Sequence, residues 1–178
     1  FYMVFTSKIA KLADIPEIES LIDASIRGLL APLIDINELE ASFDSMGLDD
    51  QLIKDGTYFL ITDKESLVGS GGWSNRKTLF GGNHTSNRDN SYLDPVLDAA
   101  KIRAMYTHPD WSRKGVGSLI INLAEKEIQK VGFKKCELMA TQSGVPLYKH
   151  HGYSEIEEFI YKSSRGNVVK MLKMGKLF

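Results

Sequence analysis

Disulfide bonds are excluded, because the 178 residues include a single cysteine, Cys136. Without cross-links the fold must rest on a packed core, and a chain of this length buries about 70% of the surface that its unfolded form exposes. A lone thiol is typical of proteins in a reducing compartment. We therefore expect one globular domain over residues 1–178, with Cys136 as a small buried apolar residue and not a nucleophile.

An excess of charge of one sign is also lacking. The chain has 22 Lys and Arg residues against 23 Asp and Glu residues, for a formal net charge of −1. This balance gives no global attraction for nucleic acid or for an anionic membrane, so we expect neither as a partner. We expect no metal either, and we interpret His108 as a turn residue and His150 and His151 as a solvated helix end.

Long apolar runs are missing too. The helical stretch from Asp14 to Leu33 contains charged residues such as Glu19 and Arg27, which do not suit a membrane-spanning segment. The N-terminus shows no basic segment followed by an apolar one, the pattern of a signal peptide. We expect a cytoplasmic protein.

Apolar periodicity predicts strands and helices around one mixed sheet. The clearest helix runs from Val116 to Val131, with Gly132 at its C-terminal end. Asp14 is the expected N-cap of an earlier helix that has Pro16 in its first turn. Further strands are expected at 5–13, 57–62, 67–73, 100–107, 135–140, 153–161 and 168–174, and further helices at 14–33, 37–54 and 143–151.

Residues 75–98 show no clear period, and a structureless stretch of this length is uncommon inside a compact domain. Two interpretations stay open: a mobile surface excursion, or a lid or wall over a substrate. Trp73 and Phe80 flank Arg76 at its start. These aromatic residues could line an acceptor site or simply pack.

The segment from Arg113 to Ser118 (RKGVGS) lies between a predicted strand and the clearest helix. The first N–H groups of a helix have no internal partner, and the helix dipole is positive there, so this end can bind an anion. Gly115 and Gly117 would let a pyrophosphate approach the backbone, although glycines also serve tight turns. The pattern is neither a Walker loop nor a Rossmann fingerprint.

Two segments, residues 105–118 (MYTHPDWSRKGVGS) and 144–153 (GVPLYKHHGY), resemble the GNAT N-acetyltransferase superfamily. The likeness extends to the order of elements over nearly the whole chain. The family loop reads Gln/Arg-x-x-Gly-x-Gly/Ala, and Ser112 stands at its first position, which removes one side-chain contact but keeps the glycines. Tyr148 and the later Gly152-Tyr153 match the second family motif.

The resemblance implies an α/β fold with a mostly antiparallel mixed sheet of six to seven strands, a central splay and helices on both faces. Acetyl-CoA would insert its pantetheine arm in the splay and pair with the backbone of Met105 and Thr107. The N–H groups of residues 113–118 would hold its pyrophosphate. The expected cofactor-binding residues are Met105, Tyr106, Thr107, Arg113, Lys114, Gly115, Val116, Gly117 and Ser118.

The implied chemistry is direct attack of a primary amine on the thioester in a ternary complex. Freeing a lysine-like amine of its proton at pH 7 costs about 4.6 kcal/mol, so a base or an ordered water is needed. Tyr148 is the family-like acid for the leaving thiolate, and Glu137 is a candidate base. Arg27 and Trp73 are candidate acceptor-binding residues.

The acceptor itself is open: a peptide N-terminus, a lysine, a polyamine, an amino acid or another amine. A non-catalytic CoA-binding sensor or adaptor with the same fold is the main alternative, and a different nucleotide enzyme is a weaker one. Dimers are common among relatives, so a homodimer is also open.

Overall fold

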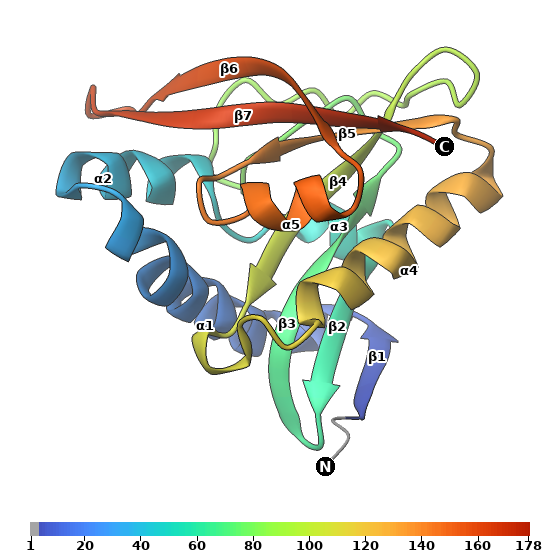
Figure 1. Cartoon of the computed structure of the whole chain (residues 1–178), viewed down its shortest axis with the longest axis horizontal. Helices are drawn as coiled ribbons and strands as arrows, with labels where there is room; N and C mark the ends of the chain where they lie inside the picture. The colour runs from blue at the N-terminus through green and yellow to red at the C-terminus, as the bar shows by residue number, and fades with distance from the viewer. Residues whose placement is uncertain (1–3) are drawn as a thin grey trace.

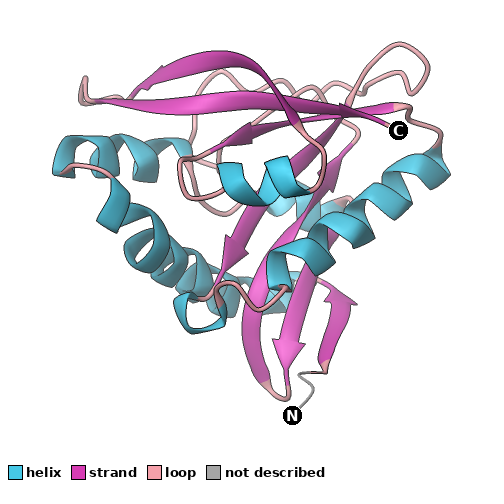
Figure 2. Cartoon of the chain, viewed as in Figure 1, coloured by secondary structure: helices cyan, strands magenta, loops and turns pink. Residues whose placement is uncertain are grey.

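The computed structural model describes residues 4–178, which form one seven-stranded sheet with the order β1-β2-β3-β4-β5-β7-β6. Every neighbouring pair is antiparallel except β4 and β5, which are parallel. The predicted mixed, mostly antiparallel sheet is confirmed (Figure 2). The strands are β1 (Phe5–Ile9), β2 (Tyr58–Asp63), β3 (Ser66–Ser74), β4 (Ala100–Thr107), β5 (Lys135–Ala140), β6 (Ser154–Lys162) and β7 (Val168–Leu177).

Helices cover both faces of this sheet, as predicted (Figure 1). Apolar residues of α1 and α3 pack with Tyr58, Leu60 and Tyr106 on one face. Those of α4 and α5 pack with Phe59 and Ile102 on the other. The helices are α1 (Ile15–Ser25), α2 (Ile36–Ser45), α3 (Asp50–Lys54), α4 (Val116–Val131) and α5 (Val145–His150). Within residues 4–178 no helix is long and apolar enough to cross a membrane.

The sheet opens at its centre, between β4 and β5. These strands pair only at Ala100–Cys136 and Lys101–Glu137, after which β4 runs on beside β3 while β5 stays with β7 (Figure 1). A bulge follows in β4, where Ala104 has a positive φ of 52° and the β3–β4 register shifts. A bulge bends its strand and increases the local twist, so it helps β4 to leave β5. The predicted splay is therefore present.

The first two predicted helices differ most from the structure. Asp14 does not cap α1 through its side chain; its carboxylate accepts hydrogen bonds from Lys8 Nζ and Lys11 N–H. Beyond α1 the helix first widens into a π-helical segment, Ile26–Leu30, and then tightens into a 3-10 turn, Ala31–Leu33.

The predicted helix over 37–54 is in fact two helices, because the residues between them form contacts with distant parts of the chain. The Gly47 N–H donates to the hydroxyl of Tyr106 at 3.1 Å. Asp49, one residue before α3, is buried beside Arg103 and also accepts from the N–H of Gln51 as the N-cap of that helix.

The segment 75–98 is pinned to the body of the protein. Arg76 donates to both carboxylate oxygens of Asp55 at 2.7 and 2.8 Å, and Arg88 donates to Asp49. Phe80 packs against two aromatic side chains of β6, with ring centroids 5.5 and 5.7 Å away. Of the two open interpretations of this segment, the contacts favour a wall.

Candidate active site

A large cavity of about 710 Å³ lies at the splay, between β4, the start of α4 and α5. Met105 and Thr107 line it from β4, and Tyr148 lines it from α5. The remaining walls come from the loop before α4 and its first turn, from the residues that lead into α5, and from the turn after α1. These residues are Ser25, Leu29, Leu33, Trp111, Ser112, Arg113, Gly115, Val116, Gly117, Ser118, Thr141, Ser143, Gly144, Pro146, Leu147 and His150.

The loop before α4 presents free backbone donors to this cavity. Leu119 is the first residue of the helix whose N–H bonds back, to the carbonyl of Gly115 at 3.0 Å. The N–H groups of Val116, Gly117 and Ser118 therefore have no helical partner. Donors at the positive end of a helix dipole fit a phosphate group, so this part of the cavity suits a pyrophosphate.

The two glycines of the loop serve different purposes. Gly115 has a φ of 91°, and a Cβ there would meet no atom within 4 Å, so glycine is needed for the left-handed backbone. A Cβ on Gly117 would lie 2.6 Å from Cδ2 of Leu147. The small size of Gly117 thus lets α5 approach α4, which brings Tyr148 to the cavity.

Ser118 is also held by a residue that the sequence did not identify. Its hydroxyl lies 2.9 Å from Nε2 of His151, which was predicted to be a solvated helix end. His151 is only partly exposed, and burial lowers the pKa of its imidazole. A neutral ring can donate to or accept from the hydroxyl, so His151 orients the side chain of Ser118 in the first turn of α4.

The β4 residues of the predicted cofactor site point in two directions. Met105 and Thr107 line the large cavity, and the Thr107 N–H donates to Oγ of Ser25 at 3.3 Å. The side chain of Tyr106, between them, is buried on the opposite face with the residues of α1. Only the backbone of Tyr106 is therefore available to the cofactor side.

A second, smaller cavity of about 70 Å³ adjoins the first through shared walls. Met105, Thr141 and Tyr148 line both cavities. Its other walls come from the α2–α3 connection, the 79–81 segment, β4, β5 and β7, through Ser45, Met46, Gly47, Leu79, Phe80, Gly81, Ile102, Arg103, Ala104, Tyr106, Met139 and Met171. The shared residues stand where a group from one cavity would meet a group from the other.

Tyr148 is the titratable side chain common to both cavities. Its ring is 7% exposed and packs edge to face with Tyr153 at 6.0 Å. Its hydroxyl makes no hydrogen bond to any other residue between 4 and 178. Burial, and to a smaller extent Tyr106, raises the pKa of Tyr148, so its phenol stays protonated at neutral pH and can donate a proton.

Glu137 lies outside both cavities. It stands where β4 and β5 still pair, with Lys101 Nζ at 2.8 Å and Lys173 Nζ at 3.7 Å from one carboxylate oxygen. Partial burial would raise the pKa of Glu137, but the two lysines outweigh it and lower the pKa. A carboxylate so held is a poor proton acceptor, and its position gives it no access to an acceptor in either cavity.

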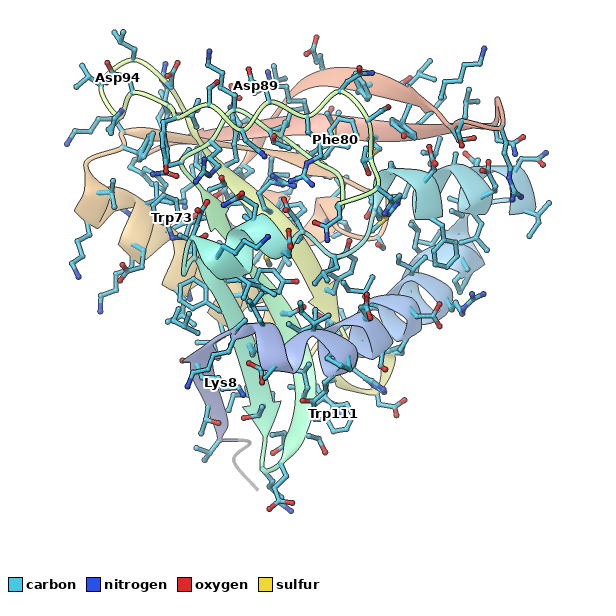
Figure 3. All side chains as sticks on the ribbon, turned by 180° about the vertical axis from the view of Figure 1, so that it is seen from behind. Lys8, Trp73, Phe80, Asp89, Asp94 and Trp111 are labelled. Atoms are coloured by element: carbon cyan, nitrogen blue, oxygen red, sulfur yellow. The ribbon has the colours of Figure 1, made fainter. Side chains whose placement is uncertain are left out.

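The two candidate acceptor-binding residues also lie outside the cavities. Trp73 is buried in the core against Phe133, with ring centroids 6.3 Å apart, and lies well away from Phe80 (Figure 3). Arg27 is exposed, pairs with Asp23 at 2.9 Å and stacks over the ring of Phe43 at 5.0 Å. Periodicity could not reveal which way these side chains point.

The comparisons with known proteins agree with this geometry. The profile of the acetyltransferase (GNAT) domain matches residues 54–155, more than half of the chain. This chain therefore belongs to the GNAT acetyltransferase family, which is named for the transfer of acetyl groups. No curated protein sequence is significantly similar to it. Residues 4–178 contain no group of His, Cys, Asp and Glu side chains arranged to hold a metal ion.

Solved structures with the same fold share little sequence with the chain. A GCN5-related N-acetyltransferase from Rhodopseudomonas palustris is 18% identical, with a TM-score of 0.72 and full coverage of both chains. The PaiA N-acetyltransferase of Thermoplasma acidophilum, solved in complex with coenzyme A, is 13% identical, with a TM-score of 0.66 over 99% of this chain and 100% of its own. The ribosomal-protein-S18-alanine N-acetyltransferase of Escherichia coli is 14% identical, with a TM-score of 0.62 over 98% and 94%.

Proposed function

We propose that this protein transfers an acetyl group from acetyl-CoA to a primary amine by direct attack in a ternary complex. The large cavity would take the co-substrate and the small cavity the amine. The observation that carries the proposal is the position of Tyr148, whose side chain lines both cavities where they adjoin.

Acetyl-CoA would supply the activated acyl group as a thioester. The free N–H groups of Val116, Gly117 and Ser118 would hold its pyrophosphate, with Arg113 beside them in the same wall. The backbone of Met105 at the open edge of β4 would orient the arm and offer an N–H to the developing oxyanion. These residues bind and position, and they leave the proton transfers to other groups.

Tyr148 would donate its proton to the leaving sulfur. An ordinary phenol with a pKa near 10 is a weaker acid than a thiol with a pKa near 8.5. Burial would also raise the pKa of a thiol beside the phenol, which makes the departing thiolate a better proton acceptor than it is in water. None of the described residues that line either cavity is a carboxylate. The amine would therefore lose its proton to water, and Glu137 is left out of the proposed mechanism.

Two observations favour a second candidate, a CoA-binding sensor without turnover. The missing carboxylate and the Ser112 substitution both remove groups that would serve catalysis or cofactor binding. Such a protein would bind acetyl-CoA and release no thiol.

Two measurements separate these candidates. Thiol release from acetyl-CoA in the presence of a panel of amines reports turnover. Thermal unfolding with acetyl-CoA, and with ATP as control, reports binding, because ligand at 100 times its dissociation constant stabilises a fold by about 2.7 kcal/mol. Amine-dependent thiol release supports the enzyme, stabilisation without release supports the sensor, and stabilisation by ATP alone contradicts both.

A further inference from the structure

The small cavity combines apolar walls with one charged side chain. Four methionines and Phe80 give it a soft apolar surface, and Arg103 is the one ionised group among its described lining residues. No acidic side chain contributes to the wall. A site that bound a polyamine or a lysine through a second positive charge would need carboxylates there.

Arg103 belongs to a buried cluster with an excess of positive charge. Its side chain is 3% exposed and lies 2.9 Å from Oδ2 of Asp49. Arg88 donates to that same oxygen at 2.6 Å. Two guanidinium groups therefore share one carboxylate, and the three side chains sum to one positive charge. Burial lowers the pKa of Arg103, but a guanidinium stays charged in proteins.

The guanidinium of Arg103 also has unused donors. It donates three hydrogen bonds within the described residues, to the carbonyls of Thr78 and Gly81 and to the carboxylate of Asp49. A guanidinium carries five N–H groups. Two of those on Arg103, including Nε–H, thus have no partner among residues 4–178. A buried charge with unmet donors favours an anionic ligand over a neutral or cationic one.

We propose that the acceptor is a compact primary amine that carries a carboxylate, such as a small amino acid, and that Arg103 binds this carboxylate in the small cavity. The volume of about 70 Å³ exceeds the roughly 10–15 Å³ that a cavity needs to hold one water, so it admits a compact group. The methionines would then contact the apolar part of the acceptor, and Tyr148 lies in the same wall. The inference rests on the proposed acetyl transfer and names its substrate class.

The test compares acceptors that differ only at the carboxylate. Thiol release from acetyl-CoA is measured with L-alanine against L-alaninamide, with L-methionine against L-methioninamide, and with spermidine. We expect kcat/KM to be at least about tenfold higher for each acid than for its amide, the effect of one hydrogen-bonded charge. A neighbouring carboxylate makes an amine more basic and leaves less of it free, so this preference would run against intrinsic reactivity.

Two variants locate the preference. Arg103→Gln should reduce the acid-to-amide ratio to near one, mainly through KM for the acid. Arg88→Gln is the matched control, because Arg88 shares Asp49 but does not line the cavity, and it should keep the ratio. If Arg103→Gln does not fold, the wild-type ratios decide.

The outcomes keep the two proposals apart. Turnover with spermidine or the amides that equals or exceeds turnover with the acids would overturn carboxylate recognition and leave acetyl transfer intact. An unchanged ratio in folded Arg103→Gln would also overturn it. No thiol release with any amine would overturn the proposed function itself.

Discussion

Replacing Tyr148 by Phe removes one hydroxyl group from the meeting point of the two cavities and leaves the ring in place. That hydroxyl has no hydrogen-bond partner among the described residues, so its loss should change the free energy of unfolding by no more than about 0.5 kcal/mol. A general acid contributes roughly 10²–10⁴-fold to a rate, which is about 2.7–5.5 kcal/mol of barrier. We therefore expect turnover to fall by that factor in a protein of nearly native stability.

Tyr153 provides a matched control, because Tyr153→Phe removes a hydroxyl that is hydrogen-bonded within the protein and lies away from the cavities. Its O–H donates to Oε1 of Glu125 at 2.9 Å, and Tyr153 lines neither cavity. Loss of a hydrogen bond to a charged group costs about 1.5–3 kcal/mol. Tyr153→Phe should thus lose stability and keep turnover, while Tyr148→Phe does the reverse.

The assays are thiol release under saturating acetyl-CoA, urea unfolding, and titration of acetyl-CoA binding. Cofactor affinity should stay within about threefold in Tyr148→Phe, since its hydroxyl is assigned to the reaction and not to binding. Because burial raises the pKa of Tyr148, its phenol should remain protonated, and turnover should show no loss from its ionisation between pH 7 and 9. Turnover of Tyr148→Phe within threefold of the wild type would refute its role as the acid.

Three further predictions concern the supports of the site. Asp49→Ala should destabilise the fold by about 3–5 kcal/mol in urea unfolding, because the buried Arg103 and the partly buried Arg88 lose their carboxylate; a loss below 1 kcal/mol would contradict this. Ser118→Asp should weaken acetyl-CoA binding at least tenfold by calorimetry, because a carboxylate in the first turn of α4 repels phosphate, although it does not destabilise the helix itself. The neutral Ser118→Asn variant should bind acetyl-CoA with an affinity closer to that of the wild type. Equal affinities of the two variants would contradict the proposed position of the phosphates. The hydrogen bond from Arg76 lowers the pKa of Asp55, so the stabilisation that this pair gives is complete above about pH 4 and is lost as the pH falls through the folded pKa. Asp55→Asn should therefore be less stable than the wild type by about 1.5–3 kcal/mol at pH 7, and the difference should shrink in acid; a difference that does not change with pH would contradict the assignment.

Local patterns predicted the elements well where neighbours in sequence decide the conformation. Helix α4 begins at Val116 and ends at Val131, as its apolar spacing indicates, and Gly132 follows with a left-handed φ of 106°. Strand β5 covers residues 135–140, as predicted, and alternates between buried and partly buried residues. The two predicted motifs also lie together: Arg113, residues 115–118 and Tyr148 line one cavity.

Distant contacts decided the rest, and they explain where prediction failed. The helix expected over 37–54 breaks because Tyr106 and Arg103, more than fifty residues later, bond to the residues between its two parts. Trp73 and Glu137 lie in strands that the sequence predicts correctly. Which face of a strand lines a cavity, and at which end, depends on the neighbouring strands, so the sequence pattern did not reveal it.

The sequence by itself determined the family, the strand and helix order and the glycine loop with free N–H groups before α4, because period, glycine placement and chain order are local properties. The tertiary structure alone decided that Tyr148 stands between two cavities and that Arg103 brings a buried positive charge to the smaller one. These features arise where β4 leaves β5 and where α5 packs on α4 across Gly117. A side chain acquires such a position only when segments far apart in the chain are packed together.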